Sequence, residues 1–159
     1  MYVLVLEREL LGMVNVLEKG DLFLVSGNIG HGVNCAGAMG KGIALEFRKR
    51  YPDMYGEYWD LCLSHKLNPG DVYTYRDELR GRYIFNLATQ KHWKLKATSD
   101  NLKSSICNLI QLMRSLGEKE VTFPRICAGL GGMIWEEVIQ IFQDLIPEDI
   151  TVNLIEKAL

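Results

Sequence analysis

The chain has 159 residues, of which 48% are hydrophobic and 24% charged, a composition typical of a globular domain and unlike that of disordered or fibrous chains. Lys and Arg number 18 against 20 Asp and Glu, and the resulting formal net charge of −2 excludes bulk attraction to polyphosphate as the main binding force. A chain of this length buries roughly two-thirds of its unfolded surface, so we expect one domain spanning residues 1–159 that needs no disulfide or metal.

The spacing of the cysteines and the length of the apolar runs indicate the cellular compartment of the protein. Cys35, Cys62, Cys107 and Cys127 are widely spaced with no C-x-x-C pair, which argues against a zinc site or a disulfide framework. No apolar run approaches the about 20 residues of a membrane span, and the N-terminus lacks the features of a signal peptide. We therefore predict a cytoplasmic monomer with reduced thiols, no metal, no cofactor and no membrane contact.

In the first half of the chain, short runs rich in β-branched residues predict strands. Apolar residues at every fourth position from Met39 to Tyr51 predict a helix, which Pro52 ends or follows with a new one. The predicted elements are strands at 2–6, 13–17 and 29–35 and helices at 39–51 and 55–63.

The second half continues the alternation of strands and helices. Its most regular helix is capped by Ser99 or Asp100 and stopped by Gly117. Because strands and helices alternate, the sequence predicts a mixed α/β layer fold with helices on both faces of the sheet. The predicted elements are strands at 72–75, 83–87, 121–123 and 151–155, a helix that begins after residue 99 or 100 and runs to 116, and a helix at 135–146.

Two glycine-rich loops, at 37–42 and 127–132, each leave a predicted strand and enter a predicted helix. Ligands bind at strand ends in α/β sheets, glycine lets the backbone approach them, and a helix N-terminus favours an anion. One such loop alone is more simply a tight turn, and neither matches a known nucleotide signature. Two loops in the same context favour a site that clamps a pyrophosphate.

Three segments resemble the macrodomain family: KGDLF at 19–23, the stretch from His31 to Ala44, and PRICAGLGGMIW at 124–135. The resemblance is strongest to the branch of ADP-ribose-1″-phosphate phosphatases, terminal ADP-ribose protein glycohydrolases and antitoxins that remove ADP-ribose from DNA. It implies a three-layer α/β/α fold with a mixed central sheet. It also implies a hydrolase acting at the distal ribose of ADP-ribose carried by protein, DNA or phosphate, and the alternative is a non-catalytic ADP-ribose reader.

The resemblance also implies the ligand contacts. Asp21 bonds the adenine amino group beside the Leu22 backbone, and Asn34 faces the distal ribose, although Asp21 is equally suited to capping a turn. The glycines of both loops hold the phosphates. The implied ligand-binding residues are Asp21, Leu22, Asn34, Gly40, Lys41, Gly42, Ile43, Ala44, Thr89, Gln90, Cys127, Gly129, Leu130, Gly131 and Gly132.

The candidate catalytic residues are His31, Lys91 and Asn34. Relatives that form a covalent adduct have a lysine directly after the threonine corresponding to Thr89 and an acid in the second glycine loop. Gln90 and Gly131 take those places here, while Lys91 comes one residue later and would face the opposite side of a strand. His31 could orient water or protonate a leaving group, or could be a buried histidine with a structural role.

A basic and aromatic cluster follows Gln90 in the sequence KHWKLK. Such a cluster could stack on a base and neutralise a nucleotide or a strand, and the alternative is a solvated loop with its tryptophan packed on the core. Cys35 and Cys127 flank the glycine loops, but no base with an orienting partner accompanies either, so neither is expected to be a nucleophile.

Overall fold

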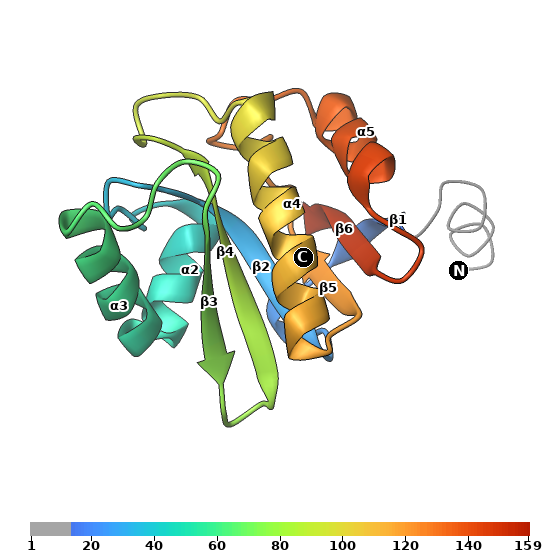
Figure 1. The fold of residues 1–159 in the computed structure, drawn as a ribbon, viewed down its shortest axis with the longest axis horizontal. Helices are drawn as coiled ribbons and strands as arrows, with labels where there is room; N and C mark the ends of the chain where they lie inside the picture. The colour runs from blue at the N-terminus through green and yellow to red at the C-terminus, as the bar shows by residue number, and fades with distance from the viewer. Residues whose placement is uncertain (1–13) are drawn as a thin grey trace.

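The computed structural model describes residues 14–159, and the strand predicted at 2–6 lies outside this range (Figure 1). The elements are β1 (Val14–Gly20), the short 3₁₀ helix η1 (Leu22–Leu24), β2 (Asn28–Asn34), α2 (Gly42–Arg50), α3 (Pro52–Leu63), β3 (Val72–Asp77), β4 (Arg82–Gln90), α4 (Ser99–Leu116), β5 (Glu120–Phe123), α5 (Trp135–Leu145) and β6 (Thr151–Ala158).

The strands form one six-stranded sheet in the order β1-β6-β5-β2-β4-β3. Each neighbouring pair is parallel except β3 and β4, which are antiparallel. The carboxyl ends of the five mutually parallel strands therefore meet at one edge of the sheet, the upper edge in Figure 1. The loops that follow β2, β4 and β5 leave from this edge, so both glycine-rich loops lie there.

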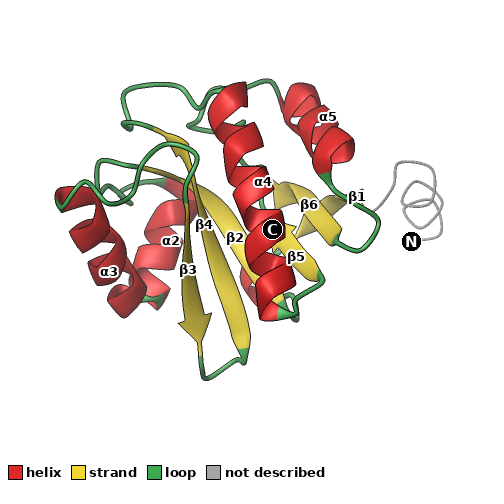
Figure 2. Cartoon of the chain, viewed as in Figure 1, coloured by secondary structure: helices red, strands yellow, loops and turns green. Residues whose placement is uncertain are grey.

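Helices cover both faces of the sheet, which confirms the predicted three-layer arrangement (Figure 2). On one face, Phe85 and Phe123 of the strands pack in a cluster with Leu102 of α4 and Phe142 of α5. On the other face, a second cluster joins the strands to α2 and α3, including Phe47, Met54 and Tyr58. In the described residues no helix is long and apolar enough to cross a membrane.

Strand β2 carries large side chains on one face of the sheet and glycines on the other. Ile29 and Val33 belong to the cluster under α2 and α3, whereas Gly30 and Gly32 face α4 and α5. A Cβ at Gly30 would lie 2.5 Å from the Phe123 ring, and one at Gly32 would lie 3.0 Å from the Thr89 hydroxyl. The absence of side chains at both glycines lets the neighbouring strands and the second glycine loop pack closely on β2.

Two predicted helix starts are wrong. The helix predicted from residue 39 begins at Gly42, because Met39 lies in the loop before α2 and is buried from there in the cluster under α2 and α3. The cap of α4 is Thr98, and neither Ser99 nor Asp100. Thr98 has an extended backbone and its hydroxyl accepts a hydrogen bond from the Asn101 amide at 3.1 Å, which is the geometry of an N-cap.

Candidate functional site

The first glycine loop is shaped by the carboxamide of Asn34, the last residue of β2. Its Oδ1 accepts hydrogen bonds from the amides of Ala36 and Ala38 at 3.0 and 3.2 Å, and its Nδ2 donates to the Ala38 carbonyl at 2.8 Å. From α3, the Tyr58 hydroxyl donates to Asn34 and the Tyr55 hydroxyl donates to the Gly37 carbonyl. Most of the hydrogen bonds that the Asn34 carboxamide can form are therefore made within this loop and with Tyr58. The predicted contact of Asn34 with the distal ribose stays a prediction.

The second glycine loop folds around Cys127, which has a left-handed backbone with φ of 65° although it is not a glycine. The Cys127 carbonyl accepts a hydrogen bond from the Met133 amide at 2.9 Å and closes the loop. A Cβ at Gly131 would lie 2.6 Å from that carbonyl oxygen. The position where relatives are expected to carry an acid therefore has no room for any side chain in this chain.

The two glycine loops meet across the carboxyl edge of the sheet. A Cβ at Gly42, the first residue of α2, would lie 3.8 Å from the Leu130 side chain, which is 71% exposed. Lys41 precedes the helix without a side-chain cap, so the amides of the first turn of α2 are free of a capping side chain. This arrangement brings Lys41–Ala44 and Gly129–Gly132 to one place, and Ile43 and Ala44 are half-buried there.

Asp21 and Leu22 lie at the end of β1, on the same edge of the sheet. The Asp21 Oδ1 accepts a hydrogen bond from the Phe23 amide at 3.0 Å and caps the 3₁₀ helix. Leu22 is buried in the cluster under α2 and α3. The capping interpretation of Asp21 is confirmed, and its contact with adenine stays a prediction.

At the end of β4, the side chains of the predicted site residues point to different places. Thr89 is buried and its hydroxyl bonds the Cys127 thiol beneath the second glycine loop. Gln90 donates from Nε2 to the Leu95 carbonyl at 2.7 Å, while its own carbonyl accepts from the Cys35 amide at 2.9 Å. Lys91 follows directly and is exposed. Of these side chains, Lys91 is the one that solvent reaches freely.

His31 lies in the core, so the structure does not support its predicted catalytic contact with the substrate. The side chain is 0% exposed, its ring stacks on Phe47 with centroids 3.9 Å apart, and its Nε2 bonds the Asn86 Oδ1 at 2.7 Å. Asn86 donates from Nδ2 to the Tyr73 carbonyl, which fixes Oδ1 as the acceptor and makes Nε2 of His31 the donor. Burial lowers the pKa of His31 to about 4, so the imidazole is neutral near pH 7.

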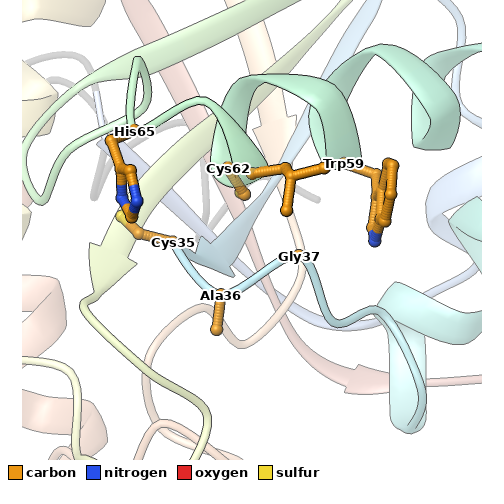
Figure 3. A pocket seen from close by; sticks show the side chains of 7 residues that line it. Cys35, Ala36, Gly37, Trp59, Cys62 and His65 are labelled. Atoms are coloured by element: carbon orange, nitrogen blue, oxygen red, sulfur yellow. The ribbon is translucent and has the colours of Figure 1, made fainter.

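The thiols beside the loops are poor nucleophiles, as the sequence predicts. Burial raises the pKa of Cys35 and of Cys127 to about 12, so both are protonated at neutral pH. Cys35 also lines a pocket of about 250 Å³ on the α3 side of the first loop, where Trp59 and His65 stand at opposite ends (Figure 3). This pocket lies against Gly37 on the side of the loop that packs on α3.

The side chains that shape the site were not predicted from the sequence. Tyr55 and Tyr58 belong to an amphipathic helix and give no sign of which loop they hold. The predicted backbone contributors, by contrast, do come together: the glycines of both loops, Lys41 and Leu130. The edge of the sheet thus offers backbone amides with cations nearby, which suits a phosphorylated ligand.

Comparison with known proteins shows which proteins this chain is similar to. The family model described as "Macro domain" matches residues 31–142. A DNA ADP-ribosyl glycohydrolase of Mycobacterium tuberculosis is 36% identical over 110 residues, covering 68% of this chain and 31% of the relative. The ADP-ribose glycohydrolase OARD1 of Homo sapiens is 30% identical over 129 residues, with 80% of each chain covered.

The fold comparison agrees with the sequence comparison. The structure of the macrodomain of Mycobacterium tuberculosis DarG superposes with a TM-score of 0.80 at 32% identity, covering 91% of this chain and 97% of the other. This chain spans about a third of the length of the mycobacterial glycohydrolase, 31%.

Proposed function

Because the chain belongs to the Macro domain family, we propose that it binds ADP-ribose between its two glycine loops and hydrolyses the bond that joins the distal ribose to a DNA base. The observation that carries the proposal is the meeting of the two loops at Gly42 and Leu130, where backbone amides from two strand-to-helix connections converge. Two relatives are glycohydrolases by name, and the mycobacterial one acts on DNA.

In the proposed reaction, the loops hold the diphosphate and a water molecule attacks the anomeric carbon. The bond from that carbon to the base breaks, and the base leaves with the bonding electrons and takes up a proton. Lys91 begins the segment that follows Gln90, whose carbonyl is bonded to the first glycine loop. We assign to the Lys91 ammonium the task of donating that proton or stabilising the charge on the leaving base.

A reader that binds ADP-ribose without chemistry is the second candidate. It is favoured by Gln90, whose amide is bonded to Leu95, and by Gly131, where the clash with Cys127 leaves no place for an acid. Both residues stand where covalently acting relatives are expected to have their reactive pair. The chain thus lacks the means for a lysine adduct at Gln90, although water-based hydrolysis needs neither group.

The experiment that separates these candidates is a substrate panel. Purified protein is incubated with ADP-ribosylated single-stranded DNA, an ADP-ribosylated glutamate peptide and ADP-ribose-1″-phosphate, and released ADP-ribose or phosphate is measured. We expect turnover on the DNA substrate above the other two. Faster release from the peptide or the phosphate ester would contradict the choice of DNA, and no release from any substrate together with tight ADP-ribose binding would establish the reader.

Gly40→Val tests the phosphate-binding role of the first loop. Gly40 is exposed, has no left-handed φ and would meet nothing within 4 Å, so the fold tolerates a side chain there. If the loop closes on the ligand, forcing in a branched side chain should cost about 1–3 kcal/mol, or roughly 5- to 150-fold in the Kd for ADP-ribose measured by calorimetry.

The matched control is Gly56→Val, which makes the same change at an exposed and open position on α3. It should leave the Kd for ADP-ribose unchanged, and both variants should unfold as cooperatively as the native protein. Native affinity in Gly40→Val would show that the first loop is a turn without ligand contact.

A further inference from the structure

The 91–96 loop connects β4 to α4, and after Lys91 it presents an aromatic and basic surface that the proposed chemistry leaves unused. Trp93 is 55% exposed, so the alternative in which it packs on the core is wrong. The His92 and Trp93 rings have centroids 4.9 Å apart, and the Lys94 Nζ lies 5.1 Å from the centroid of the Trp93 ring. An exposed indole with an ammonium over it offers a stacking face and a positive charge at one point.

The loop is fastened to both glycine loops. At its start, the Gln90 carbonyl accepts from the Cys35 amide in the first loop. At its end, the Ala97 amide donates to the Gly131 carbonyl in the second loop at 2.8 Å, and the Lys96 stem lies against Gly132. Figure 1 shows the loop arching over the upper edge of the sheet, where the proposed ligand site is. Anything attached to the ligand at that edge passes close to this surface.

Charge is unevenly distributed over the chain in a way that singles out this edge. The three loops at 35–41, 91–98 and 124–134 contain no Asp or Glu, in a protein whose formal net charge is −2. The cations in these loops are Lys41, Lys91, Lys94, Lys96 and Arg125. These three loops therefore contribute only positive charge to the edge that carries the glycine loops, which favours a polyanion there.

We propose that the 91–96 loop binds the single-stranded nucleic acid on either side of the ADP-ribosylated nucleotide, with Trp93 stacking on a neighbouring base and Lys94 contacting a backbone phosphate. This proposal rests on the proposed function for the identity of the attached group. A single strand fits better than a duplex because an exposed indole needs an unpaired base face, which a duplex offers only at its ends. Lysine and an aromatic ring give no preference for sequence, so the contact tolerates any neighbouring base.

The test uses Trp93→Ala/Lys94→Gln with two readouts. The first is fluorescence anisotropy of an unmodified strand of about 12 nucleotides, within the range of single-strand site sizes. We expect about 5- to 150-fold weaker binding in the variant, from the loss of one stacked base. The slope of log affinity against log salt should also become shallower by about 0.7, from the loss of one phosphate contact to a single strand.

The second readout is KM for the ADP-ribosylated strand compared with that for a single ADP-ribosylated nucleotide. In the native protein KM should be lower for the strand, and the double variant should remove that advantage with kcat and the Kd for free ADP-ribose unchanged. The matched control, Leu79→Ala/Lys119→Gln, removes an exposed apolar side chain and an exposed lysine away from the site and should behave as native.

Native affinity of the double variant for the unmodified strand would overturn the proposal. Equal binding of a blunt duplex with the same dependence on Trp93 would also overturn it, since the single-stranded base would then be irrelevant. If no substrate is hydrolysed, the proposed function fails, and the anisotropy measurement still decides on the strand-binding surface.

Discussion

Lys91→Ala is expected to lower kcat on ADP-ribosylated DNA by about a hundred- to ten-thousand-fold, the usual contribution of a positioned proton-transfer group. The expectation follows from position: among the side chains at the end of β4, Thr89 is buried and Gln90 is bonded to Leu95, so Lys91 is the exposed cation next to the first glycine loop. The Kd for ADP-ribose, measured by calorimetry, should change little because the proposed site holds the diphosphate with backbone amides.

A second variant distinguishes a catalytic ammonium from a merely structural lysine. Gln90→Lys combined with Lys91→Ala moves the cation to the position that covalently acting relatives use, and should recover part of the lost turnover. Lys66→Ala, which removes an exposed lysine after α3, is the control and should keep the native kcat. Full activity of Lys91→Ala on the DNA substrate would remove this residue from the mechanism and leave catalysis to the loop backbone and the substrate's own hydroxyls.

The sequence predicts the backbone of the site well because glycine spacing and strand-to-helix order are local signals. Both glycine loops lie where alternating periodicity places them, and α4 ends before Gly117 as predicted because its apolar residues follow one face over the whole helix. Parallel strands then bring the loops to one edge without further information. The contact between Gly42 and Leu130 is a consequence of this topology.

Side-chain roles are predicted less well because they depend on partners distant in sequence. Asn34 shapes the first loop with the help of Tyr58, which lies 24 positions away. His31 is in the core because Phe47 of α2 covers that face of β2, and a histidine on a strand carries no sign of which face will be covered. A side chain at position 131 would clash with the Cys127 carbonyl, so the loop needs glycine there in order to fold. Glycine at this position therefore has a structural role in addition to the predicted one of leaving room for a ligand.

The monomeric state, the cytoplasmic location and the extent of the domain over residues 1–159 stay predictions. The reactivity of the cysteines is a further property that depends on the fold. All four are free in the structure, and Cys35 and Cys127 lie beside or within the loops that would hold the ligand. The pKa values of Cys35 and Cys127 are high because both thiols are buried. The spacing of cysteines along a sequence does not predict burial.

His31 is expected to make the stability of the protein depend on pH, in place of the catalytic role that its sequence context suggests. Its pKa is about 4 in the folded state, compared with 6.5 for an unperturbed histidine, because burial disfavours the charged imidazole. Between these values the unfolded chain binds a proton that the folded chain does not. The free energy of unfolding therefore falls as pH decreases from 6.5 toward 4, by about 3 kcal/mol in total from this residue.

Denaturant unfolding of the native protein and of His31→Gln between pH 7 and pH 4 measures this contribution. The glutamine variant should be less stable at pH 7, because it loses the stacking on Phe47, and the difference between the two proteins should shrink as pH falls. The control His92→Gln, at a half-buried position in the 91–96 loop, should follow the native profile. Parallel profiles for native and His31→Gln would mean that the folded state protonates His31 after all. A folded His31→Gln protein that binds ADP-ribose normally but turns over more than about a hundred-fold more slowly would restore the histidine to the reaction.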